Sequence, residues 1–242
     1  MVYKDVLRQV WCNLHRFVLP LRCLLCGGAG ANDLDLCADC AAELPRNRCC
    51  CARCALPLAT PAVLCGECQR HVPEWDAAWA PFRYGWPLDR LESRYKFGKD
   101  LAAGRVLSIL WARESRPIER PLLLVTVPLH RSRLRRRGYN QALELARPLA
   151  RELGVPLRHD VLRRVRHTAA QTDLDAVSRR RNVRGAFAVR EAASLPAHVA
   201  ILDDVMTTGA TLSECTRVLK RSGVARVDVW ALARAPRGQH SG

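Results

Sequence analysis

The spacing of hydrophobic and polar positions changes along the chain, and after residue 75 it alternates between two kinds of segment. Continuous apolar runs such as 122–127 are typical of strands buried on both faces, whereas apolar positions recurring every three or four residues predict helices. We expect strands over 77–84, 122–127, 183–189, 199–202 and 227–232, and helices over 88–97, 100–113, 141–153 and 211–222. Because strands alternate with helices, the sequence predicts an α/β fold with a parallel sheet.

The first twenty residues predict a helix of their own. Apolar side chains recur at helical spacing at Val6, Val10, Leu14, Phe17 and Leu21. With Arg8 and Arg16 nearby, such a helix could lie on a membrane surface, but docking against its own protein is the interpretation we favour. No apolar run approaches the roughly 18–20 residues needed to span a bilayer, and no secretory signal is evident, so we expect a cytoplasmic location.

The chain is strongly basic, with 39 Lys+Arg against 23 Asp+Glu and a formal net charge of +16. Such an excess indicates a polyanionic partner, either nucleic acid or a highly phosphorylated small molecule. An arginine-rich composition that only keeps the surface soluble fits the charge equally well.

Cysteines dominate the segment between residues 23 and 68. Four CxxC pairs, here called knuckles, begin at 23, 37, 51 and 65 with a constant period of 14. Two intervening residues make a tight turn that points both sulfurs at one ion, and two knuckles complete a tetrahedron of thiolates. We therefore predict two structural Zn²⁺ ions rather than disulfides, an iron–sulfur cluster or a redox pair. The predicted ligands are Cys23, Cys26, Cys37, Cys40, Cys51, Cys54, Cys65 and Cys68.

Which knuckles share an ion is a separate question. The 28-residue repeat of two knuckles favours sequential pairing, first with second and third with fourth, but an interleaved arrangement stays open. So few large apolar residues accompany the cysteines that zinc binding is expected to supply the folding energy of this segment.

The segment 201–211 carries the most specific chemistry. Apolar residues lead to Asp203 and Asp204, and Thr207-Thr208-Gly209-Ala210-Thr211 then opens a helix. Open α/β sheets bind ligands at the carboxyl ends of their strands. Gly209 permits a backbone angle that turns consecutive N–H groups toward a phosphate, and the start of the helix adds its positive end. Both aspartates suit ribose hydroxyls, directly or through Mg²⁺.

This string resembles the signature with which type I phosphoribosyltransferases bind phosphoribosyl pyrophosphate (PRPP), and is far more specific than the alternative, a capped strand–turn–helix. Residues 201–211 are therefore called the PRPP loop below. The resemblance implies that Asp203 and Asp204 are the catalytic pair and that Mg²⁺ accompanies PRPP. The implied PRPP-binding residues are Asp203, Asp204, Met206, Thr207, Thr208, Gly209, Ala210 and Thr211.

A second polar segment, Thr126 to Gln141, follows another expected strand and is here called the arginine loop. It carries Arg131, Arg133, Arg135, Arg136 and Arg137. We interpret His130, Arg131 and Arg137 as residues that neutralise pyrophosphate, the alternative being a solvated basic loop. A third basic stretch, 163–184, lacks apolar periodicity and suggests a mobile hood over the site.

Taken in order, the motifs resemble those of the ComF family of competence-associated proteins over residues 20–235. They are the zinc module, Phe82-Arg-Tyr, Tyr95-Lys-Phe-Gly, Val127-Pro-Leu, Arg137-Gly-Tyr-Asn-Gln141, Gln171, Arg181-Asn182 and the PRPP loop. The resemblance implies a doubly wound type I phosphoribosyltransferase fold preceded by a small double zinc-ribbon domain, and a link to the uptake of single-stranded DNA in natural transformation. We expect an N-terminal helix over 1–20, the zinc ribbons over 21–74, the phosphoribosyltransferase-like domain over 75–236 and a flexible tail over 237–242.

Two functions follow from these motifs. The first is a protein that binds PRPP with Mg²⁺ and serves DNA uptake, with single-stranded DNA and the uptake machinery as partners. The alternative is a metabolic phosphoribosyltransferase, of the nucleotide-precursor or salvage type, with an unidentified acceptor. No residue set in the sequence specifies that acceptor, and the absence of GxxxxGK[ST] excludes a P-loop motor.

Overall fold

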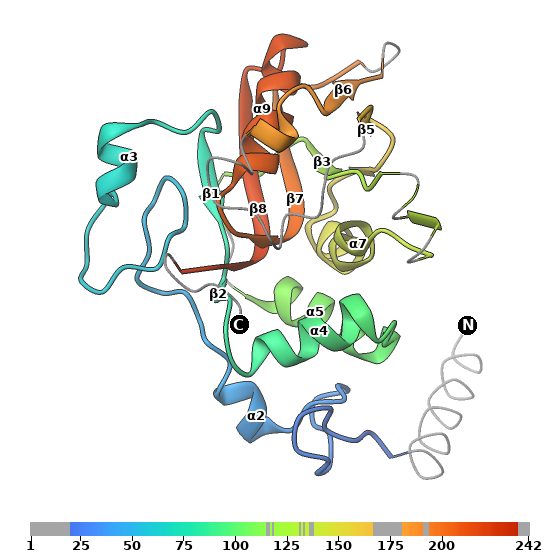
Figure 1. Cartoon of the computed structure of the whole chain (residues 1–242). Coiled ribbons are helices and arrows are strands. Elements are labelled where there is room, and N and C mark those ends of the chain that lie inside the picture. The colour runs from blue at the N-terminus through green and yellow to red at the C-terminus, as the bar shows by residue number, and fades with distance from the viewer. Residues whose placement is uncertain are drawn as a thin grey trace. The chain divides into compact units, whose positions relative to one another are not determined.

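A computed structural model describes residues 20–114, 117, 119–130, 132, 134–135, 138–166, 181–190 and 194–236 (Figure 1). The helix expected near the N-terminus lies almost entirely outside these residues, as do most of the basic stretch 163–184 and the tail. The described chain forms two compact units. The first comprises residues 20–44 and 86–106, and the second comprises residues 45–85 and 107–236.

The first unit holds the first two knuckles and the short helix α2 (Ala38–Ala42), together with α4 (Leu88–Phe97). Helix α4 buries Leu88, Leu91 and Tyr95 along one face, as its helical spacing predicts. A Cβ atom at Gly104 of α5 (Leu101–Arg113) would lie 2.5 Å from the Tyr95 ring, so the glycine allows the two helices to approach closely. Helix α4 also contacts the first zinc segment, because Arg94 Nη1 donates a hydrogen bond of 2.7 Å to the Leu24 carbonyl.

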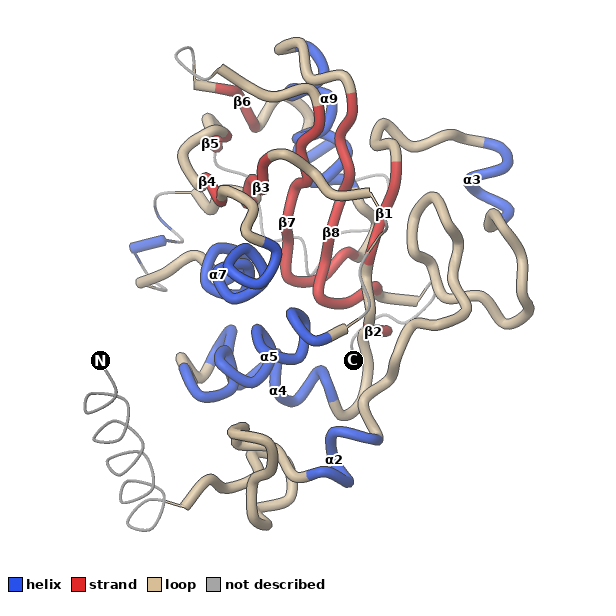
Figure 2. The backbone as a smooth tube through the Cα atoms, turned by 180° about the vertical axis from the view of Figure 1, so that it is seen from behind, coloured by secondary structure: helices blue, strands red, loops and turns tan. Residues whose placement is uncertain are grey.

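A parallel sheet forms the centre of the second unit, with strand order β1-β8-β7-β3-β4 (Figure 2). Its strands are β1 (Ala77–Trp79), β8 (Arg226–Arg234), β7 (His198–Met206), β3 (Leu123–Thr126) and β4 (Leu157–Arg158), and β2 (Phe82–Arg83) pairs with β8 beyond β1. The middle strands carry the continuous apolar runs that the sequence contains, and their side chains are almost fully buried. The predicted parallel α/β architecture is confirmed.

Two amphipathic helices pack against this sheet. Helix α7 (Gln141–Leu153) packs against β3, β4 and β7, and helix α9 (Ala210–Arg221) packs against β6 (Phe187–Val189), β7 and β8. Both bury a leucine stripe, and α7 ends where the sequence predicts, at Gly154 in the left-handed conformation (φ +58°). The helix α3 (Gly66–Arg70) belongs to the second pair of knuckles.

Some expected strand limits are wrong. The expected strand 77–84 is interrupted at Ala80 and Pro81, whose carbonyls accept hydrogen bonds from the side chain (3.0 Å) and the backbone N–H (2.7 Å) of Asn47. Of the expected strand 183–189 only β6 forms, and it pairs antiparallel with β5 (Leu162–Arg164) outside the parallel sheet. Among the described residues, no helix is long and apolar enough to cross a membrane.

Candidate functional site

The PRPP loop connects the centre of the sheet to helix α9. Strand β7 does not end before the acidic pair, as the apolar run alone suggested, but continues through Asp203 and Asp204 to Met206 because β8 keeps pairing with it. Both carboxylates are half-buried. Asp203 Oδ1 accepts a hydrogen bond of 2.9 Å from the Asp204 N–H, so the backbone itself helps to orient the first carboxylate.

Gly209 makes the turn from the strand into the helix. Its φ of +74° lies in the left-handed region, as the sequence predicted, and it occupies the N-cap position of α9. Thr208 Oγ1 accepts a hydrogen bond of 3.3 Å from the Ala210 N–H, and Ser213 N–H donates to the Gly209 carbonyl across 2.8 Å. The positive end of α9 therefore lies directly at the loop. Met206, Gly209 and Ala210 are buried, whereas Thr207 is exposed and Thr208 and Thr211 are half-buried.

The arginine loop begins beside the PRPP loop, because β3 and β7 are neighbours. Thr126 is paired with Leu202, and the Val127 N–H donates a hydrogen bond of 3.0 Å to the Leu202 carbonyl. His130 is half-buried, and its Nδ1 lies 2.8 Å from Ser132 Oγ. Arg131 and Arg137 lie outside the described residues. The structure thus brings the starts of both predicted loops to one edge of the sheet.

The eight predicted zinc ligands gather into two groups with sequential pairing. Cys23, Cys26, Cys37 and Cys40 form one group and Cys51, Cys54, Cys65 and Cys68 the other, with all sulfurs of a group within 4.8 Å of one another. A tetrahedron with Zn–S bonds of about 2.3 Å has sulfur–sulfur edges of about 3.8 Å. The Cys26–Cys37 and Cys54–Cys65 sulfur distances are both 3.7 Å, so both groups suit a Zn²⁺ ion. Cys215 is buried in α9 and belongs to neither group.

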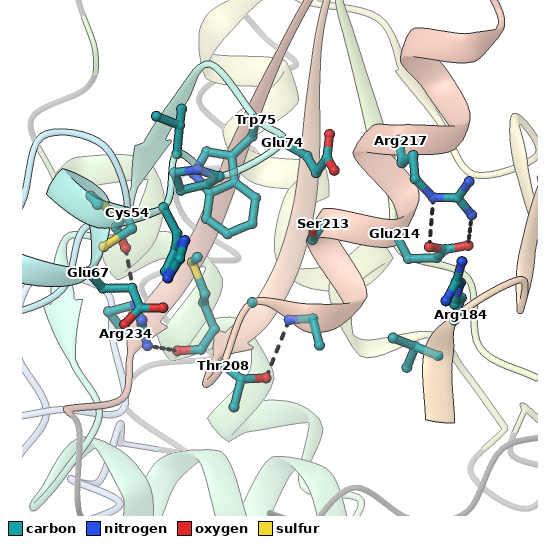
Figure 3. Close-up of a pocket in the computed structure, with 18 of the residues that line it drawn as sticks. Cys54, Glu67, Glu74, Trp75, Arg184, Thr208, Ser213, Glu214, Arg217 and Arg234 are labelled. Atoms are coloured by element: carbon teal, nitrogen blue, oxygen red, sulfur yellow. Dashed lines mark hydrogen bonds and ion pairs between the residues drawn. The ribbon is translucent and has the colours of Figure 1, made fainter. Parts of the chain in front are cut away.

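A cavity of about 490 Å³ opens between the second zinc segment, the PRPP loop and helix α9 (Figure 3). Its lining includes Cys54, Trp75, Thr208, Gly209, Glu214 and Arg234. Trp75, Glu214 and Arg234 were not among the residues expected from the sequence. A signal for Arg234 existed, because it stands at the carboxyl end of an apolar strand, as Asp203 and Asp204 do.

Glu214 is a buried carboxylate on α9. It accepts a hydrogen bond of 2.7 Å from the Gly185 N–H and forms an ion pair with Arg217. Burial alone would raise the pKa of Glu214, but Arg217 and the Gly185 N–H together lower it below the ordinary value. The ionised carboxylate therefore fastens the segment before β6 to α9.

Comparison with known proteins bears on both parts of the chain. Residues 14–69 match the double zinc ribbon domain family and residues 140–241 match the phosphoribosyl transferase domain family. Competence protein F of Haemophilus influenzae is 35% identical over 223 residues, which are 88% of this chain and 97% of that protein. The chain belongs to the ComF family. DNA utilization protein YhgH of Salmonella typhimurium is 37% identical over 226 residues, covering 89% of this chain and 98% of that protein.

A more distant ComF relative, competence protein ComFC of Streptococcus pneumoniae, is 26% identical over 234 residues, which are 88% of this chain and 100% of the relative. Together with the sheet and the two four-cysteine groups, these matches confirm the predicted fold class. This ComF protein has a phosphoribosyltransferase domain preceded by a double zinc ribbon.

Proposed function

We propose that this ComF protein binds PRPP together with Mg²⁺ at the carboxyl edge of β7 and β3 and serves the internalisation of single-stranded DNA. The observation that carries the PRPP part is the turn at Gly209. A left-handed glycine at the start of α9, five residues after an acidic pair in a central parallel strand, supports a site for a phosphate next to a ribose.

Each part of the site has a role in this proposal. Backbone and hydroxyl groups from Met206 to Thr211 hold the ribose phosphate. The carboxylates of Asp203 and Asp204 bind the ribose hydroxyls directly or through Mg²⁺, whose oxygen-rich coordination suits them and whose charge offsets that of pyrophosphate. His130, Arg131 and Arg137 neutralise the pyrophosphate from the neighbouring loop.

The DNA part rests on the relatives and on charge. Two of the relatives are named for competence and one for DNA utilization. A formal net charge of +16 supports attraction to a polyanion larger than PRPP.

Titration calorimetry with PRPP and Mg²⁺ tests the first part. We expect saturable binding to the full chain and its loss in the Asp203→Ala, Asp204→Ala double variant. Glu152→Ala, which removes an exposed carboxylate at the end of α7, is the control and should bind as the unaltered chain does. Undiminished binding in the double variant would remove the site from consideration.

Fluorescence anisotropy with a labelled single-stranded oligonucleotide tests the second part. Electrostatic binding should weaken steeply as salt rises from 50 to 200 mM, by roughly three hundredfold if six phosphates of the single strand are contacted. Absence of binding at low salt would contradict a direct DNA role. Pyrophosphate release from PRPP, followed with and without the oligonucleotide, then distinguishes a ligand-binding protein from a transferase whose acceptor is still to be found.

A further inference from the structure

We infer that the third knuckle, Cys51–Cys54, positions the PRPP loop, with Arg234 as the positioning residue between them. This inference rests on the proposed PRPP site and deepens it. It makes the second zinc site, but not the first, a determinant of PRPP affinity.

Arg234, the last residue of β8, connects the knuckle to the loop through backbone carbonyls. Its Nε donates a hydrogen bond of 3.0 Å to the Cys54 carbonyl, and its Nη1 donates one of 2.9 Å to the Met206 carbonyl (Figure 3). Nη1 also donates to the Thr207 and Ala235 carbonyls. Arg234 is only 5% exposed, and its hydrogen bonds to the Cys54 and Met206 carbonyls are buried. Without the guanidinium the Cys54 carbonyl would lose this donor, at a cost typical of buried polar groups. The Met206 carbonyl would keep only its hydrogen bond from the Ala235 N–H.

Trp75 forms a second connection between the same knuckle and the same loop. Its indole Nε1 donates a hydrogen bond of 2.7 Å to the carbonyl of Arg53, inside the Cys51–Cys54 turn. The other end of the ring lies against Gly209, where a Cβ atom would be 2.7 Å from Cη2. The knuckle therefore fixes an aromatic wall directly behind the glycine that turns the chain into α9.

The segment that carries Trp75 is itself anchored to the sheet and to α9. Asp76 Oδ2 accepts a hydrogen bond of 2.8 Å from the Val227 N–H, and Asp76 Oδ1 lies 3.0 Å from Lys220 Nζ on α9. Arg53 Nη1 donates to the Asp76 carbonyl across 2.6 Å. Displacement of the knuckle would disturb the end of β7 through Arg234 and the start of α9 through Trp75.

The second group of cysteines links a zinc ion to the contacts between the knuckle and the PRPP loop. Cys51, Cys54, Cys65 and Cys68 are all buried and suited to one Zn²⁺, which would hold the knuckle turn in shape. The first group of cysteines belongs to the other compact unit, so it provides a matched comparison. Coupling between two sites is reciprocal, so PRPP must in turn stabilise the second zinc site.

The first experiment compares Cys68→Ser with Cys40→Ser, which stand at equivalent positions of the 28-residue repeat. Zinc content by mass spectrometry should fall by one ion in each variant. Calorimetry with PRPP and Mg²⁺ should show at least tenfold weaker binding for Cys68→Ser and less than a twofold change for Cys40→Ser. Equal effects of the two variants would overturn the inference.

Arg234→Met keeps the experiment decisive if Cys68→Ser fails to fold. This variant retains all eight cysteines and should retain both zinc ions while binding PRPP at least tenfold more weakly. Arg234→Lys restores the charge but not the planar fork, so it should recover only part of the affinity. Full affinity in Arg234→Met would show that Arg234 does not position the loop.

Zinc release to a colorimetric chelator provides a readout that a purely structural role would not change. PRPP with Mg²⁺ should slow release from the second site at least threefold in the unaltered chain. The slowing should disappear in Arg234→Met and in the Asp203→Ala, Asp204→Ala control. If the unaltered chain binds no PRPP, the proposed function fails. If it binds PRPP without protecting zinc, the proposed function stands and the inference fails.

Discussion

The side-chain amide of Asn140 donates a hydrogen bond of 3.0 Å to the carbonyl oxygen of Val127, and this contact joins the two ends of the arginine loop. The same side chain caps helix α7, because Asn140 Oδ1 accepts a hydrogen bond of 3.1 Å from the Ala142 N–H. Asn140 thus sets where the loop leaves the sheet and where it enters the helix.

Replacing Asn140 separates these two roles. Asn140→Ala should destabilise the protein by about 1 kcal/mol through loss of the cap. Asn140→Ser keeps a capping hydroxyl but is too short to reach Val127, so it should remain nearly as stable as the unaltered chain. Both variants should bind PRPP several-fold more weakly in calorimetry, because the loop loses its closure. Unchanged PRPP affinity in both would contradict a role for this contact in the site.

A side chain at Gly209 should weaken PRPP binding as well as strain the backbone. Gly209→Ala forces alanine into a positive φ and against Trp75, whereas Gly223→Ala meets the same backbone problem (φ +92°) in open space. Gly223→Ala should lower the free energy of unfolding by about 1 kcal/mol. Gly209→Ala should lower it further, because its Cβ would lie too close to the Trp75 ring. Only Gly209→Ala should lower PRPP affinity, by at least tenfold. Equal PRPP binding by the two variants would argue against Gly209 as part of the phosphate site.

Glu214→Gln should reveal the stabilising role of the buried carboxylate. Loss of the charge weakens the contacts with Arg217 and the Gly185 N–H, which we expect to cost about 1–3 kcal/mol at pH 7. Because the pKa of folded Glu214 is lowered, its contribution is complete above the unfolded value near 4.3 and is lost only as the pH falls further. Urea unfolding should therefore give the same difference from the unaltered chain at pH 7 and pH 5.5. A difference that shrinks over this range would contradict the lowered pKa. Glu152→Gln, at an exposed position, is the control.

The two zinc ions should leave at different rates. In the first group Cys26 is exposed and Cys37 and Cys40 are half-buried, whereas all four cysteines of the second group are buried. A chelator therefore reaches the first group more easily, and release should show a fast and a slow phase. Cys68→Ser should retain only the fast phase and Cys40→Ser only the slow one. A single phase in the unaltered chain would mean that burial does not control release.

Much of the fold follows from local patterns. Helices 88–97 and 141–153 begin and end where their apolar spacing and flanking glycines predict, because both signals act within one or two turns. The CxxC spacing identified all eight cysteines of the two groups for a similar reason, since each knuckle is a local turn.

Other features depend on partners distant in the sequence and could not be predicted in this way. Strands β4 and β5 contain two and three residues, too few to show a period, and exist because neighbouring strands pair with them. The extension of β7 through Asp203 and Asp204 likewise depends on β8 rather than on the polar residues themselves. Trp75 reaches the site through contacts that no local pattern encodes, whereas Arg234 could have been found from its place at the carboxyl end of an apolar strand.

The hydrogen bond between Arg234 and the Cys54 carbonyl joins residues that are 180 positions apart in the sequence. During synthesis the knuckle is therefore made long before Arg234. At about 5–20 residues per second, a ribosome needs on the order of ten seconds or more to extend the chain from one to the other. Once Cys68 has been made, the nascent chain can load zinc into the second ribbon, well before synthesis of the strand that carries Arg234. Zinc can therefore be bound before the proposed PRPP site is complete, and on our inference a cell short of zinc would accumulate newly made chains whose sheet is finished but whose loop is misaligned.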